Sequence, residues 1–542
     1  MTKTSAGCLA VLPLLLAMPA TPSRAATYRT LSHAVVESAR AHPAEPIDVL
    51  VTYRHRPGGF ERGRAQALGA QLRAQFDVVP VMALRASAAS LKRLADDPSV
   101  GAITLDVPVC ADALSVPSAA RAAVFGVQNL AQSGSGVTVA VLDSGLNSHP
   151  DLKNVVLAAV APSGGKSSDE NGHGNHVSGI IVASGEKSSG LYRGLAANTK
   201  IVSVRVLDAN GRGTTSSVLA GLNWVLTNRD KYKIRVANIS LGHPAVDPSS
   251  ADPLVAAVEA LWDAGVVVVC SAGNAGAQGY GTVSSPGTSR KVITVGSVTH
   301  WGNLVSEDDK VSSYSSKGPT RFDQIAKPDL VAPGNRIIST RSKDSLLERT
   351  HPEWKVVAPG MAAPEYFVLS GTSMAAAEVS AAVALMIEKE PTLTPDAVKA
   401  RLMRSARKVQ MGDPFAVGAG VLDVAAALGS GGTPGAASSP AVVRDASSGM
   451  LVFENTAVTW GGAQWSLEQL FSTVLWSDTA LWGDAVGSVG AIFSDTALWG
   501  DTALWSDTAL WSDTALWSDT ALWSDTALWS DSASWGDAGD GD

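Results

Sequence analysis

Five segments rich in Val and Ile recur between residues 137 and 298, and they constrain the fold more than any other feature. They read VTVAVLD, KIVSVRVLD, VANISLG, VVVVCSAGN and KVITVGSV. Each segment is apolar on both faces, and helical segments alternate with them, a pattern typical of a parallel sheet covered by helices on both sides. The sequence therefore predicts an α/β domain that closes near Leu428.

A second regular pattern precedes this domain, between residues 46 and 110. Strands IDVLVTY, DVVPVMALRAS and VGAITLDVPV alternate with helical segments, one of them expected near Arg62–Phe76. This order predicts a small α+β unit of ferredoxin-like topology. Residues 111–134 are rich in Ala and Ser and are expected to connect the two units.

The first 26 residues have the three parts of an export signal. Lys3 supplies the positive end, CLAVLPLLLAM the apolar core, and small residues near Ala25 the cleavage site. The apolar run is too short to span a bilayer. We therefore expect a secreted, extracellular protein that retains Cys110 and Cys270, too few cysteines for a disulfide framework.

Four polar residues stand where catalytic groups are expected. Asp143 ends an apolar strand, His173 lies between two glycines at a helix start, and Ser373 opens a long Ala-rich helix. A serine, a histidine and an aspartate are the set needed to activate a hydroxyl nucleophile. Asn274 ends a further strand, and its amide is suited to donate to an oxyanion.

Each of these residues also has a structural interpretation, as a cap, a satisfied histidine or a loop residue. Their combination is specific, however. The segments DSG, HGNHV and GTSMA resemble the three signature segments of the subtilisin-like serine proteases (subtilases), over roughly residues 120–430. The resemblance implies that Asp143 orients the base, His173 is the general base, Ser373 is the nucleophile and Asn274 belongs to the oxyanion hole.

The same resemblance implies a substrate groove for extended protein or peptide substrates. Its two edges would be Ser240, Leu241 and Gly242 on one side, and Gly211, Arg212 and Gly213 on the other. Ser271, Ala272 and Gly273 would lie along the first specificity pocket. No cofactor is required for this chemistry.

The resemblance further implies that residues 27–115 are a propeptide, which in this family assists folding, inhibits the enzyme and is removed by self-processing. The cut is expected between Val107 and Ala123. Some positions depart from the family pattern. Glu378 falls within the buried helix and needs a partner, Asn175 replaces a threonine as a polar exchange of little consequence, and His176 is expected to be structural.

Behind an expected linker at residues 431–444 lies an acidic tail, residues 445–542. The tail has no Lys or Arg but 15 Asp or Glu, which excludes nucleic-acid binding by phosphate neutralisation. From Ser494 to Trp529 a hexapeptide, Ser/Gly-Asp-Thr-Ala-Leu-Trp, repeats six times. Extended structure suits this period better than helix. The Asp in each repeat leaves structural calcium open, because nothing in the spacing defines a cage.

Two functions remain open at this point. In the first, the chain is a secreted endopeptidase whose tail serves self-association or attachment to the cell envelope. In the second, the tail is a surface-assembly or adhesive module, and the protease domain serves mainly for its maturation. The complete catalytic set argues against an inactive scaffold.

Overall fold

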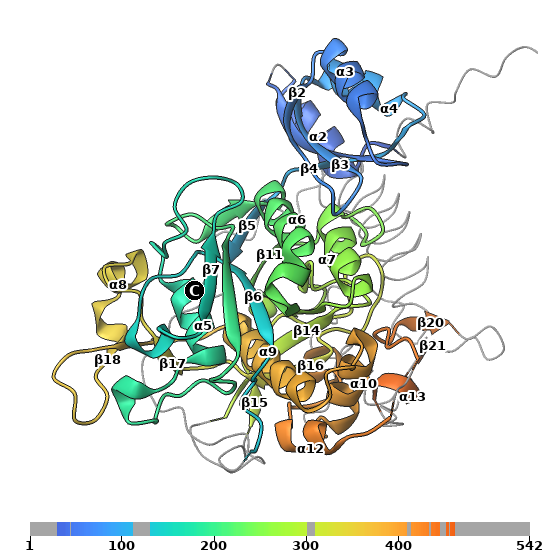
Figure 1. Ribbon diagram of the computed structural model, residues 1–542. Coiled ribbons are helices and arrows are strands. Elements are labelled where there is room, and N and C mark those ends of the chain that lie inside the picture. Colours follow the sequence, from blue (N-terminus) through green and yellow to red (C-terminus); the bar gives the residue numbers. More distant parts are fainter. Residues whose placement is uncertain are drawn as a thin grey trace, which may run out of the picture.

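The computed structural model in Figure 1 has a small N-terminal unit above a larger α/β body. The expected signal peptide, most of the expected connector and the hexapeptide repeats lie outside the described residues. The structure describes residues 30–43, 45–111, 130–300, 309–408, 413–432, 435–444, 451–454 and 456–460.

The N-terminal unit is a four-stranded antiparallel sheet with helices. Its elements are α2 (His33–Ala41), β1 (Ile47–Tyr53), α3 (Gly59–Ala67), β2 (Gln71–Gln75), β3 (Val81–Ala86), α4 (Ala88–Ala95) and β4 (Val100–Leu105). The strand order β2-β3-β1-β4 is the ferredoxin-like order. The helix expected near Arg62–Phe76 is wrong in its second half, because Gly69 adopts a φ of 86° after α3 and the chain continues as β2.

The body is built on the predicted, mostly parallel sheet, which has eight strands. Along it run β15, β14, β12, β10, β6, β8 and β7 in that order, with β16 beside β14. Only β15 pairs antiparallel among these strands. Their bounds are β6 (Thr138–Asp143), β7 (Val156–Val160), β8 (Lys200–Arg205), β10 (Ile234–Ile239), β12 (Val267–Ser271), β14 (Ile293–Thr299), β15 (Lys310–Val311) and β16 (Leu330–Pro333).

Helices cover both faces of the sheet, as the apolar strands require. α6 (Thr215–Tyr232) and α7 (Pro253–Asp263) pack against each other and against the sheet, and α5 (His173–Val182) and α9 (Thr372–Lys389) form a second packed pair (Figure 1). α9 is buried over nearly its whole length, so small Ala side chains allow the sheet to approach it closely. In the described part of the chain, no helix is long and apolar enough to cross a membrane.

The remaining elements form two smaller sheets and several short helices. β13-β11-β5-β9 is one sheet and β17-β19-β18 the other. The bounds are β5 (Pro108–Ala111), β9 (Arg212–Thr214), β11 (Leu241–Pro244), β13 (Ser284–Ser285), β17 (Ile337–Thr340), α8 (Leu346–Thr350), β18 (Lys355–Val356), β19 (Tyr366–Leu369), α10 (Pro395–Ser405), α11 (Pro414–Val417) and α12 (Val424–Gly429). Short 3-10 helices lie at Pro150–Leu152, Glu186–Ser188, Gly276–Gln278 and Pro352–Trp354.

Residues expected to form a linker and the start of the tail are instead packed on the body. We call the described residues 435–444, 451–454 and 456–460 the C-terminal clasp; it contains β20 (Val442–Arg444), β21 (Leu451–Phe453) and α13 (Thr456–Thr459). The main chain of the clasp bonds to the body, with Ala326 N donating to Pro440 O at 2.7 Å and Val442 N to Gln324 O at 3.0 Å. Trp460 is 1% exposed and packs edge-on against Phe453.

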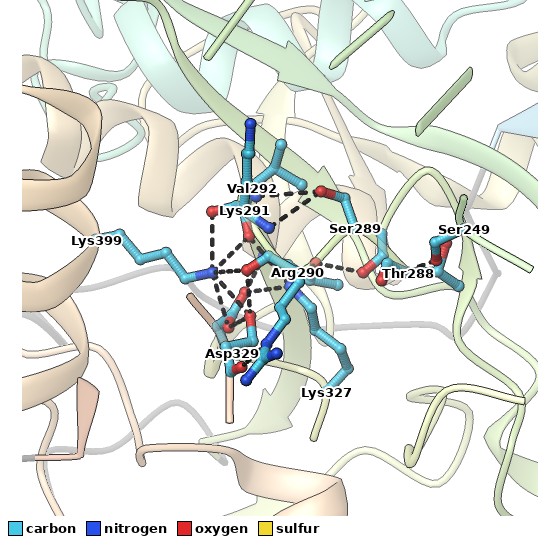
Figure 2. Close-up of polar contacts among 12 residues, drawn as sticks. Ser249, Thr288, Ser289, Arg290, Lys291, Val292, Lys327, Asp329 and Lys399 are labelled. Atoms are coloured by element: carbon cyan, nitrogen blue, oxygen red, sulfur yellow. Dashed lines mark hydrogen bonds and ion pairs between the residues drawn. The ribbon is translucent and has the colours of Figure 1, made fainter. Parts of the chain in front are cut away.

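The clasp also contacts a buried cluster of charges, and Figure 2 shows the charged members Lys327, Asp329 and Lys399. Asp329 Oδ2 accepts from Lys327 Nζ at 2.6 Å, and Oδ1 accepts from Ser439 Oγ at 2.5 Å. Lys399 Nζ lies 3.3 Å from Oδ1. All three charged residues are fully buried, and burial lowers the pKa of Lys399 to about 7. Lys399 Nζ also donates to Ser439 Oγ at 2.8 Å. The side chain of Ser439 therefore joins the clasp to the charged groups beneath it.

Replacing Ser439 by Ala should destabilise the body. The change removes the hydroxyl that donates to the buried Asp329 carboxylate and accepts from the buried Lys399 amine. Hydrogen bonds to charged groups contribute about 1.5–3 kcal/mol to the free energy of unfolding. We expect a lower denaturation midpoint in urea at an unchanged slope. Ser438→Ala is the matched control, because Ser438 precedes it in the clasp and is only partly buried. Equal midpoints for the two variants would contradict this role of Ser439.

Candidate active site

Asp143 lies at the carboxyl end of β6, near the middle of the sheet. β6 runs between β10 and β8, and all six of its residues are buried. A strand enclosed on both faces brings a polar side chain to the rim of the sheet only where it ends, which is where ligand and catalytic groups gather in α/β folds. The carboxylate of Asp143 is 1% exposed.

His173 is the first residue of α5, and its ring contacts Asp143 directly. Nδ1 lies 2.8 Å and 2.9 Å from the two carboxylate oxygens. Since an ionised carboxylate only accepts, Nδ1 carries the hydrogen and Nε2 is left as the basic nitrogen. Gly172 allows the helix to begin here, because its φ of 110° is a left-handed conformation that favours glycine.

Ser373 is the second residue of α9, and it is fully buried. The α9 helix packs on α5, so Ser373 and His173 both occupy the first turns of two neighbouring helices. Ser373 Oγ donates to Ser240 O at 3.0 Å, and Ser240 Oγ donates to Ser373 O at 3.1 Å. These two bonds tie the start of α9 to the residue that precedes β11.

Asn274 follows β12, and its side-chain amide is held in one orientation. Its Oδ1 accepts from the main-chain N and from Oγ1 of Thr372, each at 3.1 Å. Its Nδ2 is buried and has no hydrogen-bond partner among the described residues. The preceding Gly273 has a φ of 102°, and a Cβ there would lie 2.4 Å from Ser284 Oγ, so a side chain is excluded. The arrangement leaves an amide donor beside the start of α9.

The segments expected to form the groove edges flank β5. β5 pairs antiparallel with β11, opposite Leu241 and Gly242, and with β9, opposite Arg212 and Gly213. Ala111 N also donates to Gly211 O at 3.0 Å. The last described residues before position 112 thus lie as an extended strand between the two expected edges.

Ser271, Ala272 and Gly273 lie at the end of β12 and are buried. Main-chain bonds join this segment to its surroundings, since Ala272 N donates to Val295 O and Ser316 N to Gly273 O. The expected specificity-pocket residues are thus brought next to Asn274.

The N-terminal unit contacts the body through α6. Asp106 accepts from Ser216 N at 2.9 Å and from Ser216 Oγ at 2.6 Å, in the first turn of α6. Burial raises the pKa of Asp106, although these two bonds oppose the shift. About two turns further along α6, Asn223 Oδ1 accepts from the main-chain N of Asp77 and Val78 at 2.9 and 3.0 Å.

Several residues singled out from the sequence have definite surroundings. His176 Nε2 contacts the carbonyls of Ile337 and Phe367 at 3.0 and 3.1 Å, which suits a structural histidine. Asn175 is more than a polar exchange, because its side chain bonds both main-chain groups of Asn147. Glu378 is 1% exposed in α9. Cys110 and Cys270 are both free thiols.

Sequence reasoning missed Asp169, a fully buried carboxylate beside the Asp143–His173 contact. Its signal in the sequence is its place four residues before His173, in the stretch DENGHGNH. No group of three or more His, Cys, Asp or Glu within the described ranges is arranged to hold a metal ion.

Comparisons with known proteins identify the family of the chain. The sequence profile of the Subtilase family matches residues 134–420. The chain is 39% identical over 325 residues to the serine protease AprX of Bacillus subtilis, covering 59% of this chain and 71% of AprX. It is 33% identical over 354 residues to the alkaline protease of Alkalihalobacillus alcalophilus, covering 65% and 80% of the two chains.

A solved structure supports the same fold. The crystal structure of fervidolysin from Fervidobacterium pennivorans, a keratinolytic enzyme related to subtilisin, superposes with a TM-score of 0.59 at 22% identity. The match covers 76% of this chain and 65% of fervidolysin. With a family profile that spans more than half of its length, the chain belongs to the subtilase family of subtilisin-like serine proteases.

Proposed function

We propose that the chain is a secreted endopeptidase in which Ser373, His173 and Asp143 cleave peptide bonds through an acyl-enzyme. The contact of His173 Nδ1 with both oxygens of Asp143 carries this proposal. Ser373 Oγ leaves its bond to Ser240 O, gives its proton to His173 Nε2 and bonds to the substrate carbonyl carbon. The imidazolium, stabilised by Asp143, then gives the proton to the leaving amine, and water repeats the sequence to release the acid.

Asn274 is proposed to stabilise the oxyanion that forms on the substrate carbonyl. Because Thr372 occupies Oδ1 with two donors, the amide hydrogens on Nδ2 are directed away from Thr372. A donor already oriented before the reaction needs no reorganisation when the charge develops. The main-chain N–H groups at the start of α9 supply further donors near Ser373.

Ser373→Ala should abolish hydrolysis of a short peptide substrate and labelling by a fluorophosphonate. Asn274→Ala should retain labelling, with kcat lowered by about 10²–10³-fold, the usual loss for one oxyanion donor. Ser373→Ala should melt close to the wild type, because it loses one neutral hydrogen bond to Ser240 O, whereas Asn274→Ala should melt somewhat lower, because Thr372 N and Oγ1 lose their acceptor. Casein digestion by the Ser373→Ala protein would refute the assignment of the nucleophile.

We further propose that residues 27–115 form a propeptide that occupies its own enzyme's groove. The supporting observation is β5, which adds a strand between β9 and β11 in the manner of a bound extended peptide. An internal strand of this kind prevents substrate from reaching the same edges. The chain leaves β5 at Ala111, within the region where the cut by self-processing is expected.

The isolated segment 27–115, added in trans, should inhibit the mature enzyme at a stoichiometry near one to one. Asn223→Ala in the enzyme should weaken this inhibition, because two main-chain N–H groups of the segment lose their acceptor. Asn228→Ala is a control on the same helix, since Asn228 bonds only within α6. A folded segment that fails to inhibit would contradict the propeptide assignment.

The proposal also includes export of the chain and a role for its tail. The leader-like residues 1–26 support export, and the acidic, Trp-rich repeats support attachment to the cell envelope or self-association. The alternative, in which the protease domain mainly matures an adhesive repeat protein, predicts little activity on unrelated proteins. We favour the endopeptidase because β5 occupies a groove that recognises main chain rather than a particular sequence.

A chain that ends after Trp460 should hydrolyse a short peptide as fast as the full chain, because the clasp is retained. Its sedimentation or its retention by cells should differ, because apolar Trp surface has been removed. A chain that ends after Gly432 is the contrasting variant, and it should melt at a lower temperature because it lacks Ser439 and Trp460. Loss of peptide turnover on removing residues 461–542 would make the repeats part of the catalytic unit.

A further inference from the structure

Asp169 is a carboxylate that the mechanism above does not use, although it lies fully buried near the catalytic residues. Its Oδ1 accepts from Ser144 Oγ at 2.8 Å and from Gly172 N at 2.7 Å, and its Oδ2 accepts from Asn175 N at 2.7 Å. All three donors are neutral. A buried carboxylate with this many donors is held in one position and one orientation.

The first turn of α5 depends on these bonds. Gly172, which caps the helix, has no side chain to accept from the free N–H groups of that turn. Asp169 accepts from Asn175 N, and Ser144 Oγ accepts from Gly174 N at 2.9 Å. Residues outside the helix thus cap the turn that carries His173.

The same network reaches the partner of His173. Ser144 directly follows Asp143, and its main-chain N donates to Asp143 Oδ1 at 2.7 Å. Because Ser144 Oγ is held by Asp169, one carboxylate restrains both the end of β6 and the start of α5. A shift of either would change the contact between His173 and Asp143.

Resting on the proposed catalytic roles, we propose that Asp169 is a positioning residue of the catalytic centre. Its carboxylate fixes Ser144 and the first turn of α5, and through them the geometry between Asp143 and His173. It also supplies a second negative charge close to the imidazolium that forms during the reaction. The orientation of His173 relative to Asp143, which Asp169 maintains, therefore governs kcat. The negative charge of Asp169 governs the pH at which His173 becomes protonated.

Both oxygens of Asp169 accept hydrogen bonds from Ser144 Oγ and two main-chain N–H groups, and this geometry suits the ionised carboxylate that the proposal requires. Burial, together with the nearby charge of Asp143, raises the pKa of Asp169, whereas the three donors favour the ionised form. Other titratable groups lie on the elements packed around this network. They are Asp143 on β6, His173 and His176 on α5, Lys166 and Glu170 before α5, Arg205 on β8, and Arg341 and Glu348 around α8.

The test is Asp169→Asn, which keeps the shape but places an amide NH₂ against an N–H donor. We expect kcat on a short peptide to fall by about tenfold to hundredfold, as small misplacements of reacting groups do, with KM changed less than about threefold. The acid limb of the pH profile of kcat/KM should move to lower pH. Ser144→Ala should lower kcat without that move, because it removes a link but no charge.

Ser342→Ala is the matched control. Ser342 Oγ donates to the main-chain O of Asp169 and accepts from Asn147 Nδ2, both at 2.7 Å, so the variant removes two neighbouring bonds and leaves the three bonds to the Asp169 carboxylate in place. It should keep the wild-type kcat and pH profile. Wild-type kinetics in Asp169→Asn would overturn the proposal, as would equal losses in Asp169→Asn and Ser342→Ala.

A second measurement is independent of turnover and of maturation. The titration of His173 is followed by proton NMR in the Ser373→Ala protein, with and without Asp169→Asn. Its midpoint should move to lower pH in the double variant, and an unmoved midpoint would overturn the proposed role of the charge. If the wild type hydrolyses no peptide while the midpoint moves, the proposed function fails and the role of Asp169 remains. If Asp169→Asn does not fold, Ser144→Ala tests orientation: a wild-type kcat there overturns it.

Discussion

A strand that is buried on both faces offers a polar side chain to its surroundings only where it ends, and β6 is such a strand. This constraint sets the position of Asp143, and the rest of the site is arranged around it. His173, the first residue of α5, contacts the carboxylate of Asp143, and α9 packs against α5. Both helices pack on the sheet, so the polar groups are held by the largest apolar core of the molecule.

The predictions of a subtilisin-like serine protease and of the mostly parallel sheet are confirmed. The sheet was predictable because strands enclosed by helices must be apolar on both faces, as the five Val- and Ile-rich segments are. The edge strand β7 could not be predicted from this pattern, since Val156 and Leu157 remain exposed. The packing of the clasp on the body was not predicted, for another reason. A run of Gly, Ala, Ser and Pro is typical of linkers, yet small side chains such as Ala437 and Ser439 also suit close packing.

In the candidate site, too, some features follow from the local sequence and others only from the tertiary structure. The types and order of Asp143, His173, Asn274 and Ser373 are legible in the sequence because each stands at the end of an element. Their roles, like those of the expected groove residues, stay predictions that the variants above test. Asp169 could not be assigned, because its link to Asp143 runs through Ser144, 25 residues away in the chain, although its other two donors, Gly172 N and Asn175 N, are close in sequence.

The sheet β13-β11-β5-β9 is continuous only while β5 is present. Covalent attachment keeps this strand at a high effective concentration, so it outcompetes any free peptide for the groove. If the chain is cut as proposed, β5 is retained by affinity alone, and β9 and β11 become open edges only when it leaves. Cutting and activation are then separate events, and the delay between them is set by how slowly one short strand leaves. In the proposed precursor, the enzyme therefore stays inactive after the cut for as long as β5 remains bound between its two neighbouring strands.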